Sequence, residues 1–268
     1  MNFNNTEDMT LKEKCYFYQK RRDYFLNDND YIIAHIDGRS FSHMIKNKFA
    51  KPFDENFVHM MNETAKYLCE KVQGVQLAYT QSDEISLLIK KTNPKGDIFF
   101  GGRMCKMQSI IASLATGIFN RMMLEYEIEN NTDGIQVILK NIPLYQFDCK
   151  VWDVPSADDA MAWFLFRNID CIRNSKQQTA QSYLSHKELM GKHTDEQIEL
   201  LYKEHGVDWN LFNDGLKYGR LIVKRDVECT REENGNIITF TRSKWFADDG
   251  MDLTIKENRD LFKKIWYC

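Results

Sequence analysis

The order of apolar runs in the first third of the chain constrains its fold more than any other feature of the sequence. Residues 31–37 (YIIAHID) form a short apolar run that ends in a polar turn, which is typical of a buried strand. Through residues 54–72, apolar side chains recur at steps of three and four, which predicts an amphipathic helix. Gly74 follows directly, where a left-handed helix cap is expected.

A second pattern follows at once. The β-rich runs 75–80 and 85–90 flank the polar tetrad QSDE, which predicts a hairpin with Asp83 and Glu84 at or beside its turn. A long helix is expected from about residue 102 to 126, where small and apolar residues dominate. The first half of the chain therefore reads β–α–β–β–α, which is compatible with an α+β fold built on a split ferredoxin-like sheet.

The flanking segments are predicted to alternate between helices and strands. Helices are expected at 11–27, 156–190 and 194–205, and strand pairs at 135–151 and at 219–245, the latter closing around residues 233–235. Only four prolines occur, and no Gly/Ser-rich or low-complexity stretch marks a linker. We expect a core at 1–155 and a C-terminal part at 156–268, made of helices and a β-hairpin, packed on that core.

Charge and cysteine usage exclude some classes of protein. The net charge of -3 does not indicate a nucleic-acid binder, but a local basic patch would suffice for one. The seven cysteines are odd in number, far apart and without a CxxC pair, which argues against a disulfide framework or a zinc knuckle. No signal peptide or membrane span is indicated, so we expect a soluble protein of a reducing compartment, such as the cytoplasm or, in a eukaryote, the mitochondrion.

Two acidic positions stand out because of where they are placed. Asp37 ends the first predicted strand, and Asp83 with Glu84 caps the hairpin. In a βαββ sheet these points can lie side by side at one edge. Paired carboxylates next to the carbonyl of Gly38 would offer the hard oxygen ligands that Mg²⁺ prefers, and two such ions can clamp a phosphoryl displacement. Singly, Asp-Gly and Ser-Asp-Glu are common turn sequences, so only their joint placement favours a metal site.

Basic residues near these carboxylates are candidates for binding phosphates. Lys51 precedes the amphipathic helix, and Arg103 with Lys106 share one face at the start of the long helix, where the helix dipole also favours anions. The alternative for each is an ordinary exposed charge. Further candidates flank the site, the basic ones as phosphate contacts and the histidines in structural or RNA-contact roles: Arg39, Lys46, Lys48, His35 and His43.

The segments HIDGRSFSHMIKNKFAKPFDENFVHMMNETA and LAYTQSDEISLLI closely resemble the signature of the tRNA-His guanylyltransferase family. That family includes guanylyltransferase-like polymerases that work in the 3′→5′ direction. The resemblance spans about residues 30–125 and is fainter beyond. It implies a fold like the palm of polymerases and nucleotidyl cyclases, with an antiparallel sheet flanked by helices.

The resemblance also assigns roles to individual positions. Asp37, the carbonyl of Gly38 and Asp83 match the family's metal-binding positions, and Glu84 lies next to them. Other residues match positions that contact the nucleotide and its triphosphate: Ser82, Lys51, Arg103 and Lys106. The implied cofactor is a pair of Mg²⁺ ions, and the implied substrates are ATP, GTP and other NTPs. The implied assembly is a homotetramer.

The implied reaction adds nucleotides to the 5′ end of a tRNA. The 5′ phosphate is first activated, by adenylylation with ATP or as a triphosphate. The 3′ hydroxyl of an incoming NTP then attacks it and pyrophosphate leaves. Basic residues of the second half become candidates for tRNA contacts, with solvated surface as the alternative for each: Lys176, Lys187, Lys217, Arg220, Lys224 and Arg225.

One departure bears on the substrate. Eukaryotic members that act on histidine tRNA carry an H-I-N-N-x-Y-N motif where this chain has DCIRNSKQQT at 170–179, so the histidine is missing. The following AQSYLSHKEL resembles the bacterial and archaeal branch, whose members favour template-directed repair of 5′-truncated tRNA. We therefore expect repair, with guanylate addition to histidine tRNA as the alternative. A nucleotidyl cyclase, a conventional polymerase and an inactive RNA-binding relative are the other hypotheses, although the intact carboxylates argue against the last.

Overall fold

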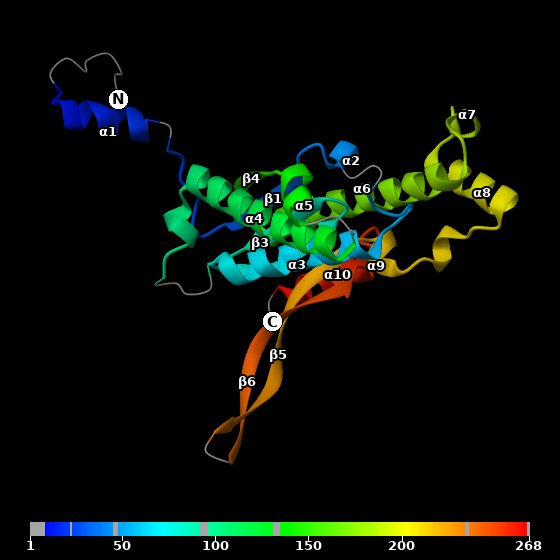
Figure 1. Ribbon diagram of the computed structural model, residues 1–268. Helices are drawn as coiled ribbons and strands as arrows, with labels where there is room; N and C mark the ends of the chain where they lie inside the picture. The colour runs from blue at the N-terminus through cyan, green and yellow to red at the C-terminus, as the bar shows by residue number, and fades with distance from the viewer. Residues whose placement is uncertain are drawn as a thin grey trace.

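The protein is described here by a computed structural model that covers residues 9–21, 23–44, 48–91, 96–130, 135–233 and 236–266 (Figure 1). The strands are β1 (Tyr31–Gly38), β2 (Val75–Gln81), β3 (Glu84–Ile89), β4 (Phe147–Val154), β5 (Arg220–Glu233) and β6 (Asn236–Asp249). The longer helices are α1 (Leu11–Lys20), α3 (Glu55–Lys71), α4 (Met104–Asn130), α6 (Ala157–Tyr183), α8 (Thr194–His205) and α10 (Lys256–Ile265). The shorter ones are α2 (Phe41–Met44), η1 (Phe99–Gly102), α5 (Ile135–Asn141), α7 (His186–Leu189), η2 (Trp209–Leu211) and α9 (Asp214–Lys217).

One antiparallel sheet organises the molecule. Its six strands run in the order β4-β1-β3-β2-β5-β6. Helices cover both of its faces, so β1 is buried almost throughout instead of alternating between buried and exposed residues. Ile32, Ala34 and Ile36 of β1 pack in one core cluster, and Ile33 packs in another. This two-sided burial explains the continuous apolar run in the sequence.

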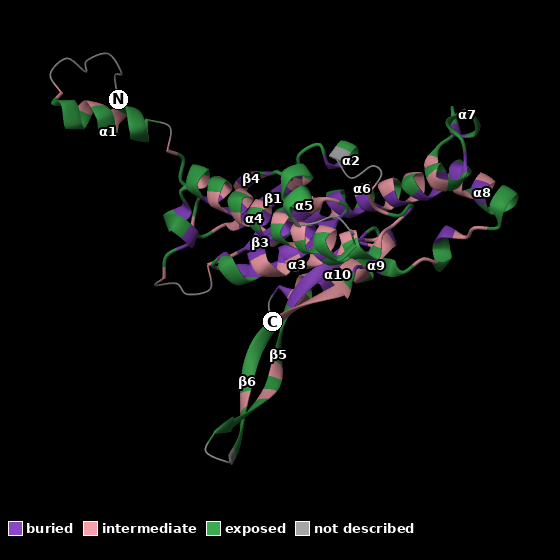
Figure 2. Ribbon diagram, in the orientation of Figure 1, coloured by how far each residue is buried: buried purple, intermediate pink, exposed green. Residues whose placement is uncertain are grey.

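Each face of the sheet has its own helical layer. Met61 and Leu68 of α3 and Phe119 of α4 belong to the core on one face. Phe164 of α6 and Phe262 of α10 belong to the core on the other face. In Figure 2 the buried residues line the sheet and the inward sides of these helices. The α+β architecture predicted from the sequence, an antiparallel sheet flanked by helices, is confirmed.

The β5–β6 hairpin extends well beyond this body. Only its base is buried, at residues 220–223 of β5, and the remainder is mostly exposed (Figures 1 and 2). The base pairs with β2 through Ala78, Tyr79 and Thr80. Because of this pairing the sheet crosses the predicted boundary at residue 155, and the division into a core and a C-terminal part stays a prediction.

The sequence prediction failed in two places, and two further expectations lie on residues outside the described ranges. The segment 135–141 was expected to be a strand but forms α5, which buries Ile138 while Val137 and Leu139 are exposed. Burial on a single face of this segment, packed on α4, suits a helix despite its β-branched residues. The helix predicted at 11–27 ends at Lys20. The turn predicted at 233–235 falls largely outside the described residues, as does Lys46.

Over the described ranges, no helix combines the length and the apolar character that crossing a membrane requires.

Candidate active site

The structure brings the end of β1 and the β2–β3 turn together. Asp37 lies opposite Glu84 in the β1–β3 register, and the Gly38 amide donates a hydrogen bond to the Asp83 carbonyl at 3.1 Å. The turn between β2 and β3 contains only Ser82 and Asp83, and Ser82 has a φ of 47°. Non-glycine residues rarely adopt that backbone conformation, and such strain clusters at functional sites. The predicted meeting of Asp37 and Asp83 at one edge is therefore present.

Gly38 has a packing role of its own. A Cβ atom at this position would lie 2.7 Å from Cγ of Phe41, closer than real contacts allow. The Phe41 ring is fully enclosed by Phe119, Tyr145 and Phe147, with ring centroids 4.9–5.3 Å away, so it cannot move aside. The glycine after Asp37 is therefore required by the packing of the core beneath it, in addition to any role of its carbonyl as a metal ligand.

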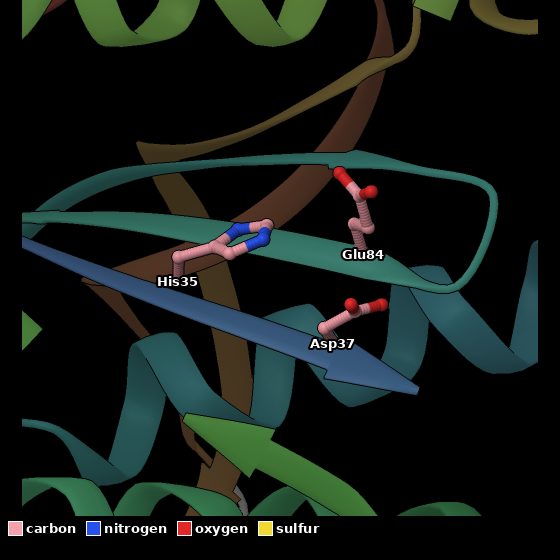
Figure 3. A group of neighbouring side chains, drawn as sticks. All are labelled: His35, Asp37 and Glu84. Carbon is pink, nitrogen blue, oxygen red and sulfur yellow. The ribbon is translucent and has the colours of Figure 1, made fainter. Parts of the chain in front are cut away.

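Three side chains converge on the face of the sheet that α6 covers. One ligand atom from each of His35, Asp37 and Glu84 lies within 4.8 Å of the others. Figure 3 shows the three side chains on neighbouring strands. His35 Nδ1 is 3.3 Å from Ser86 Oγ, which also accepts a hydrogen bond from the Trp163 indole at 3.1 Å. Burial, aided by two nearby cations, lowers the pKa of His35 to about 4. This histidine is therefore neutral at neutral pH.

Glu84 is held by an arginine from α6. Arg167 Nη2 lies 2.7 Å from Glu84 Oε1, and its Nε lies 3.0 Å from Oε2. Gln81 donates to the same carboxylate at 2.8 Å. Arg167 also binds Asp170 at 2.9 Å. Burial raises the pKa of Glu84 while the guanidinium opposes that rise, so the two influences partly cancel.

The other carboxylates at this edge have no such partner. Burial raises the pKa of Asp83 to about 6, and the Ser82 hydroxyl, 3.0 Å away, opposes this. Burial also raises the pKa of Asp37, and Asp148 of β4, directly opposite in register, adds to the rise. Within the described part of the chain, no lysine or arginine forms an ion pair with these three aspartates. Arg167 and Lys150 attract Asp37 only from a longer range. Clustered carboxylates without a direct ion-pair partner fit a divalent cation with oxygen ligands.

A cavity of about 380 Å³ opens beside the turn. Its walls include Ser82 and Asp83 from the turn, Lys51 from the loop before α3, and Arg220 from the base of β5. α6 supplies four amide side chains on one side: Asn174, Gln177, Gln178 and Gln181. The cavity thus combines the carboxylate edge with cations and with hydrogen-bonding groups.

Arg103 and Lys106 lie elsewhere in this chain. Arg103 bridges to Phe25, ahead of β1, so it sits at the opposite end of the sheet from Asp37. α4 reaches the site end only at Thr116, which accepts a hydrogen bond from the Phe147 amide opposite Gly38. Thr116 lies thirteen residues after Arg103 along α4, about 20 Å at the usual helical rise. The expectation that both cations seat phosphates beside Asp83 therefore does not hold within one chain.

The remaining predicted residues divide into exposed and buried ones. Arg39 donates to Gln146 at 2.9 Å, and Lys176 pairs with Asp195 at 2.6 Å. Lys187 is exposed on α7. Lys217 is only 7% exposed, and its ammonium binds the Asn210 carbonyl and Asp214, each at 2.9 Å. The expectation that Lys217 contacts tRNA is corrected, because its side chain is buried and its ammonium is already paired within the protein.

Sequence reasoning missed two residues of the site, Arg167 and Asp148. Arg167 and Asp170 are three apart on a predicted helix, which was a visible signal of an ion pair. No periodicity within one sequence indicates that this arginine reaches Glu84, 83 residues away. Asp148 became relevant only through the register of β4 against β1.

Comparisons with known proteins identify chains that are similar over most of their length. A tRNA(His) guanylyltransferase of Debaryomyces hansenii is 27% identical over 228 residues, which cover 81% of this chain and 82% of that protein. A bacterial tRNA(His) guanylyltransferase-like protein in complex with ATP matches with a TM-score of 0.80 and 27% identity, covering 96% of this chain and 99% of that one. A bacterial protein of the same description in complex with GTP matches with a TM-score of 0.72 and 26% identity over the same shares.

These matches confirm the palm-like fold that the resemblance implied. The family described as tRNAHis guanylyltransferase matches residues 12–155, which include both carboxylate segments and Lys51. Because that match spans more than half of the chain, the protein belongs to the tRNAHis guanylyltransferase family of nucleotidyltransferases.

Proposed function

We propose that this protein is a magnesium-dependent 3′→5′ nucleotidyltransferase that extends the 5′ end of a tRNA. One observation carries the proposal: Asp37, Gly38 and Asp83 meet at one end of the sheet, beside a cavity that also contains Lys51 and Ser82. ATP, GTP and other NTPs are the proposed substrates, and the matched bacterial structures contain ATP and GTP.

In this proposal the carboxylates of Asp37 and Asp83, with the carbonyl of Gly38, hold two Mg²⁺ ions. Bound there, Mg²⁺ supplies the positive charge that phosphoryl transfer requires at the attacking and leaving oxygens. Lys51 and Ser82 bind the triphosphate and orient it toward the carboxylate edge. Glu84, fixed by Arg167, keeps the start of β3 in register with Asp37, so that the two aspartates stay aligned.

Within this activity we favour template-directed repair of 5′-truncated tRNA. The sequence 170–179 lacks the histidine of the eukaryotic motif. The structural match to a bacterial guanylyltransferase-like protein extends over nearly the whole of both chains, which also supports this branch. Guanylate addition to histidine tRNA is the second candidate, because relatives with that name align with most of this chain.

The proposed assembly is a homotetramer, as the family resemblance implies. The proposed compartment is the cytoplasm, and the described cysteines are all free, as a reducing environment requires.

The deciding experiment follows incorporation of labelled NTPs, with Mg²⁺ and ATP, into a tRNA lacking its first 5′ nucleotide. A full-length histidine tRNA without the extra guanylate is tested in parallel. Extension of the truncated tRNA with the nucleotide that its template strand specifies supports repair. Guanylate addition to the histidine tRNA alone would support the second candidate. No incorporation into either RNA would contradict both.

A further inference from the structure

Arg220, at the first position of β5, is a buried arginine that forms no direct ion pair within the described residues, although the Asp249 carboxylate attracts it from a longer range. Arg220 is only 7% exposed. Its Nε donates to Asn62 Oδ1 at 2.8 Å and its Nη1 donates to the Gly215 carbonyl at 3.2 Å. Both acceptors are neutral. Within the described ranges, no carboxylate lies within ion-pair distance of this guanidinium, and the Asp249 carboxylate opposite it in register instead accepts from Asn213 at 2.8 Å.

Such an arrangement is unfavourable for the protein alone. Removing a charged group from water costs several kcal/mol unless an opposite charge or a full set of hydrogen bonds compensates for it, by order-of-magnitude estimates. The guanidinium has five N–H donors, and within the described residues two hydrogen bonds use them. Arginine does not lose its proton to relieve the cost. No atom of this guanidinium is both buried and without a hydrogen-bond partner, so its remaining donors are accessible from the cavity that Arg220 lines and can bind an anion there.

The position of Arg220 limits where that anion can lie. Arg220 lines the 380 Å³ cavity together with Lys51, Ser82 and Asp83. In the β2–β5 register it lies opposite Thr80, two residues before Ser82. An anion held by Arg220 thus lies in the same cavity as the proposed triphosphate ligands and close to the turn that carries Asp83. Surface contact with an RNA backbone, the role expected from the sequence, does not suit a side chain this deep.

We propose that Arg220 is a phosphate-binding residue whose guanidinium takes a phosphoryl group of the ligand that occupies this cavity. This proposal rests on the proposed function, because it assigns one more ligand contact to that site. The planar fork of arginine suits the paired oxygens of a phosphate, and Lys51 supplies a second positive charge. The phosphoryl group belongs either to the incoming nucleotide or to the 5′ end of the RNA. Both carry phosphate oxygens that Arg220 and Lys51 can bind.

The test compares wild type with Arg220→Gln, using Arg121→Gln as the matched control. Arg121 is an exposed arginine of α4 whose ion pair among the described residues is with Glu125, four residues on, and it lies outside the cavity. Two affinities are measured by calorimetry in the presence of Mg²⁺. One is for inorganic tripolyphosphate without RNA, and the other compares 5′-phosphorylated with 5′-hydroxyl tRNA.

If Arg220 binds the nucleotide, Arg220→Gln lowers tripolyphosphate affinity by about tenfold or more, since charged hydrogen bonds are lost. If it binds the RNA end, tripolyphosphate affinity is unchanged and the preference for 5′-phosphorylated tRNA disappears. Unchanged values for both ligands in a folded variant would overturn the proposal. Arg121→Gln should match wild type throughout.

A second variant guards against loss of the fold. Arg220→Lys keeps the charge but lacks the fork, so it should fold and still lose part of the phosphate affinity. A purely structural role would lower the unfolding midpoint while leaving phosphate binding intact, which would count against the proposal. Because tripolyphosphate binding needs no turnover, an inactive wild-type protein that still shows this Arg220 dependence would contradict the proposed function alone.

Discussion

At the scale of single residues, substitution of Asp83 is the clearest way to test activity separately from stability. Its side chain is hydrogen-bonded to Ser82 in a two-residue turn, and burial already works against its charge. We expect Asp83→Ala to reduce nucleotide incorporation by at least about a hundredfold, because a site of this kind depends on charge placed at the reacting oxygens. The unfolding midpoint should not fall. Asp260→Ala, at an exposed position of α10, is the control and should retain activity. Normal incorporation by Asp83→Ala would exclude Asp83 as a metal ligand.

The raised pKa of Asp83 also predicts how Mg²⁺ binding depends on pH. With a pKa of about 6, Asp83 is ionised at neutral pH and protonated in mild acid. Since a ligand carboxylate must be ionised, the apparent Mg²⁺ affinity should fall about tenfold on going from neutral pH to about pH 5. Titration of Mg²⁺ against the unfolding midpoint at both pH values measures this.

The same group has a stability effect with a defined sign. Its folded pKa lies above its usual value of 3.8, so its contribution to metal-free stability is full in acid and is lost as pH rises through about 6. His35, whose pKa is lowered, acts in the opposite direction. Asp83→Asn isolates the aspartate: the variant should gain stability over wild type at neutral pH and not in acid. Equal pH profiles would show that Asp83 titrates normally.

At the scale of elements, the link between α6 and β3 is the contact to test. Arg167 and Glu84 side chains are 11% and 19% exposed, so their pairing is only weakly screened by water. Arg167→Met leaves Glu84 close to Asp37 with the Gln81 hydrogen bond but without its ion-pair partner, and should cost about 2 kcal/mol in urea unfolding, below the range for fully buried pairs. Adding Glu84→Gln should recover part of that loss.

Arg173→Met provides the comparison on the same helix. Arg173 also pairs with Asp170, at 2.8 Å, but its side chain is 56% exposed. Its removal should cost at most about 0.5 kcal/mol, as is usual for surface ion pairs. Equal losses for both variants would mean that the contact with Glu84 adds nothing to stability.

The sequence predicted those elements that depend on local signals, and it failed where tertiary contacts decide the structure. The strand ending at Asp37 and the hairpin at Asp83 were predictable because their apolar runs and turn residues are local signals. Their meeting followed from sheet topology. α5 was missed because its β-branched residues favour a strand, and only its packing on α4 selects the helix. The locations of Arg103 and Lys217 depend on tertiary contacts that no local pattern encodes.

At the scale of the whole molecule, the net charge of -3 means that a tRNA is bound by local cations against an overall repulsion. Phosphate contacts release counterions, so tRNA affinity should fall at least about tenfold between roughly 50 and 200 mM salt. Filter binding across this range gives the slope. A flat response would contradict a basic tRNA-binding face.

The close contact between Gly38 and Phe41 limits which residues position 38 can accept as the sequence evolves. The same residue must lack a side chain to admit the Phe41 ring and must offer its carbonyl to the proposed metals. Substitutions are easier to accommodate at the four amide residues of α6 that line the cavity, and on the outer part of the β5–β6 hairpin, because side chains there border solvent. Any side chain at position 38 would collide with the Phe41 ring. Changes of substrate preference therefore have to arise by substitutions at other positions.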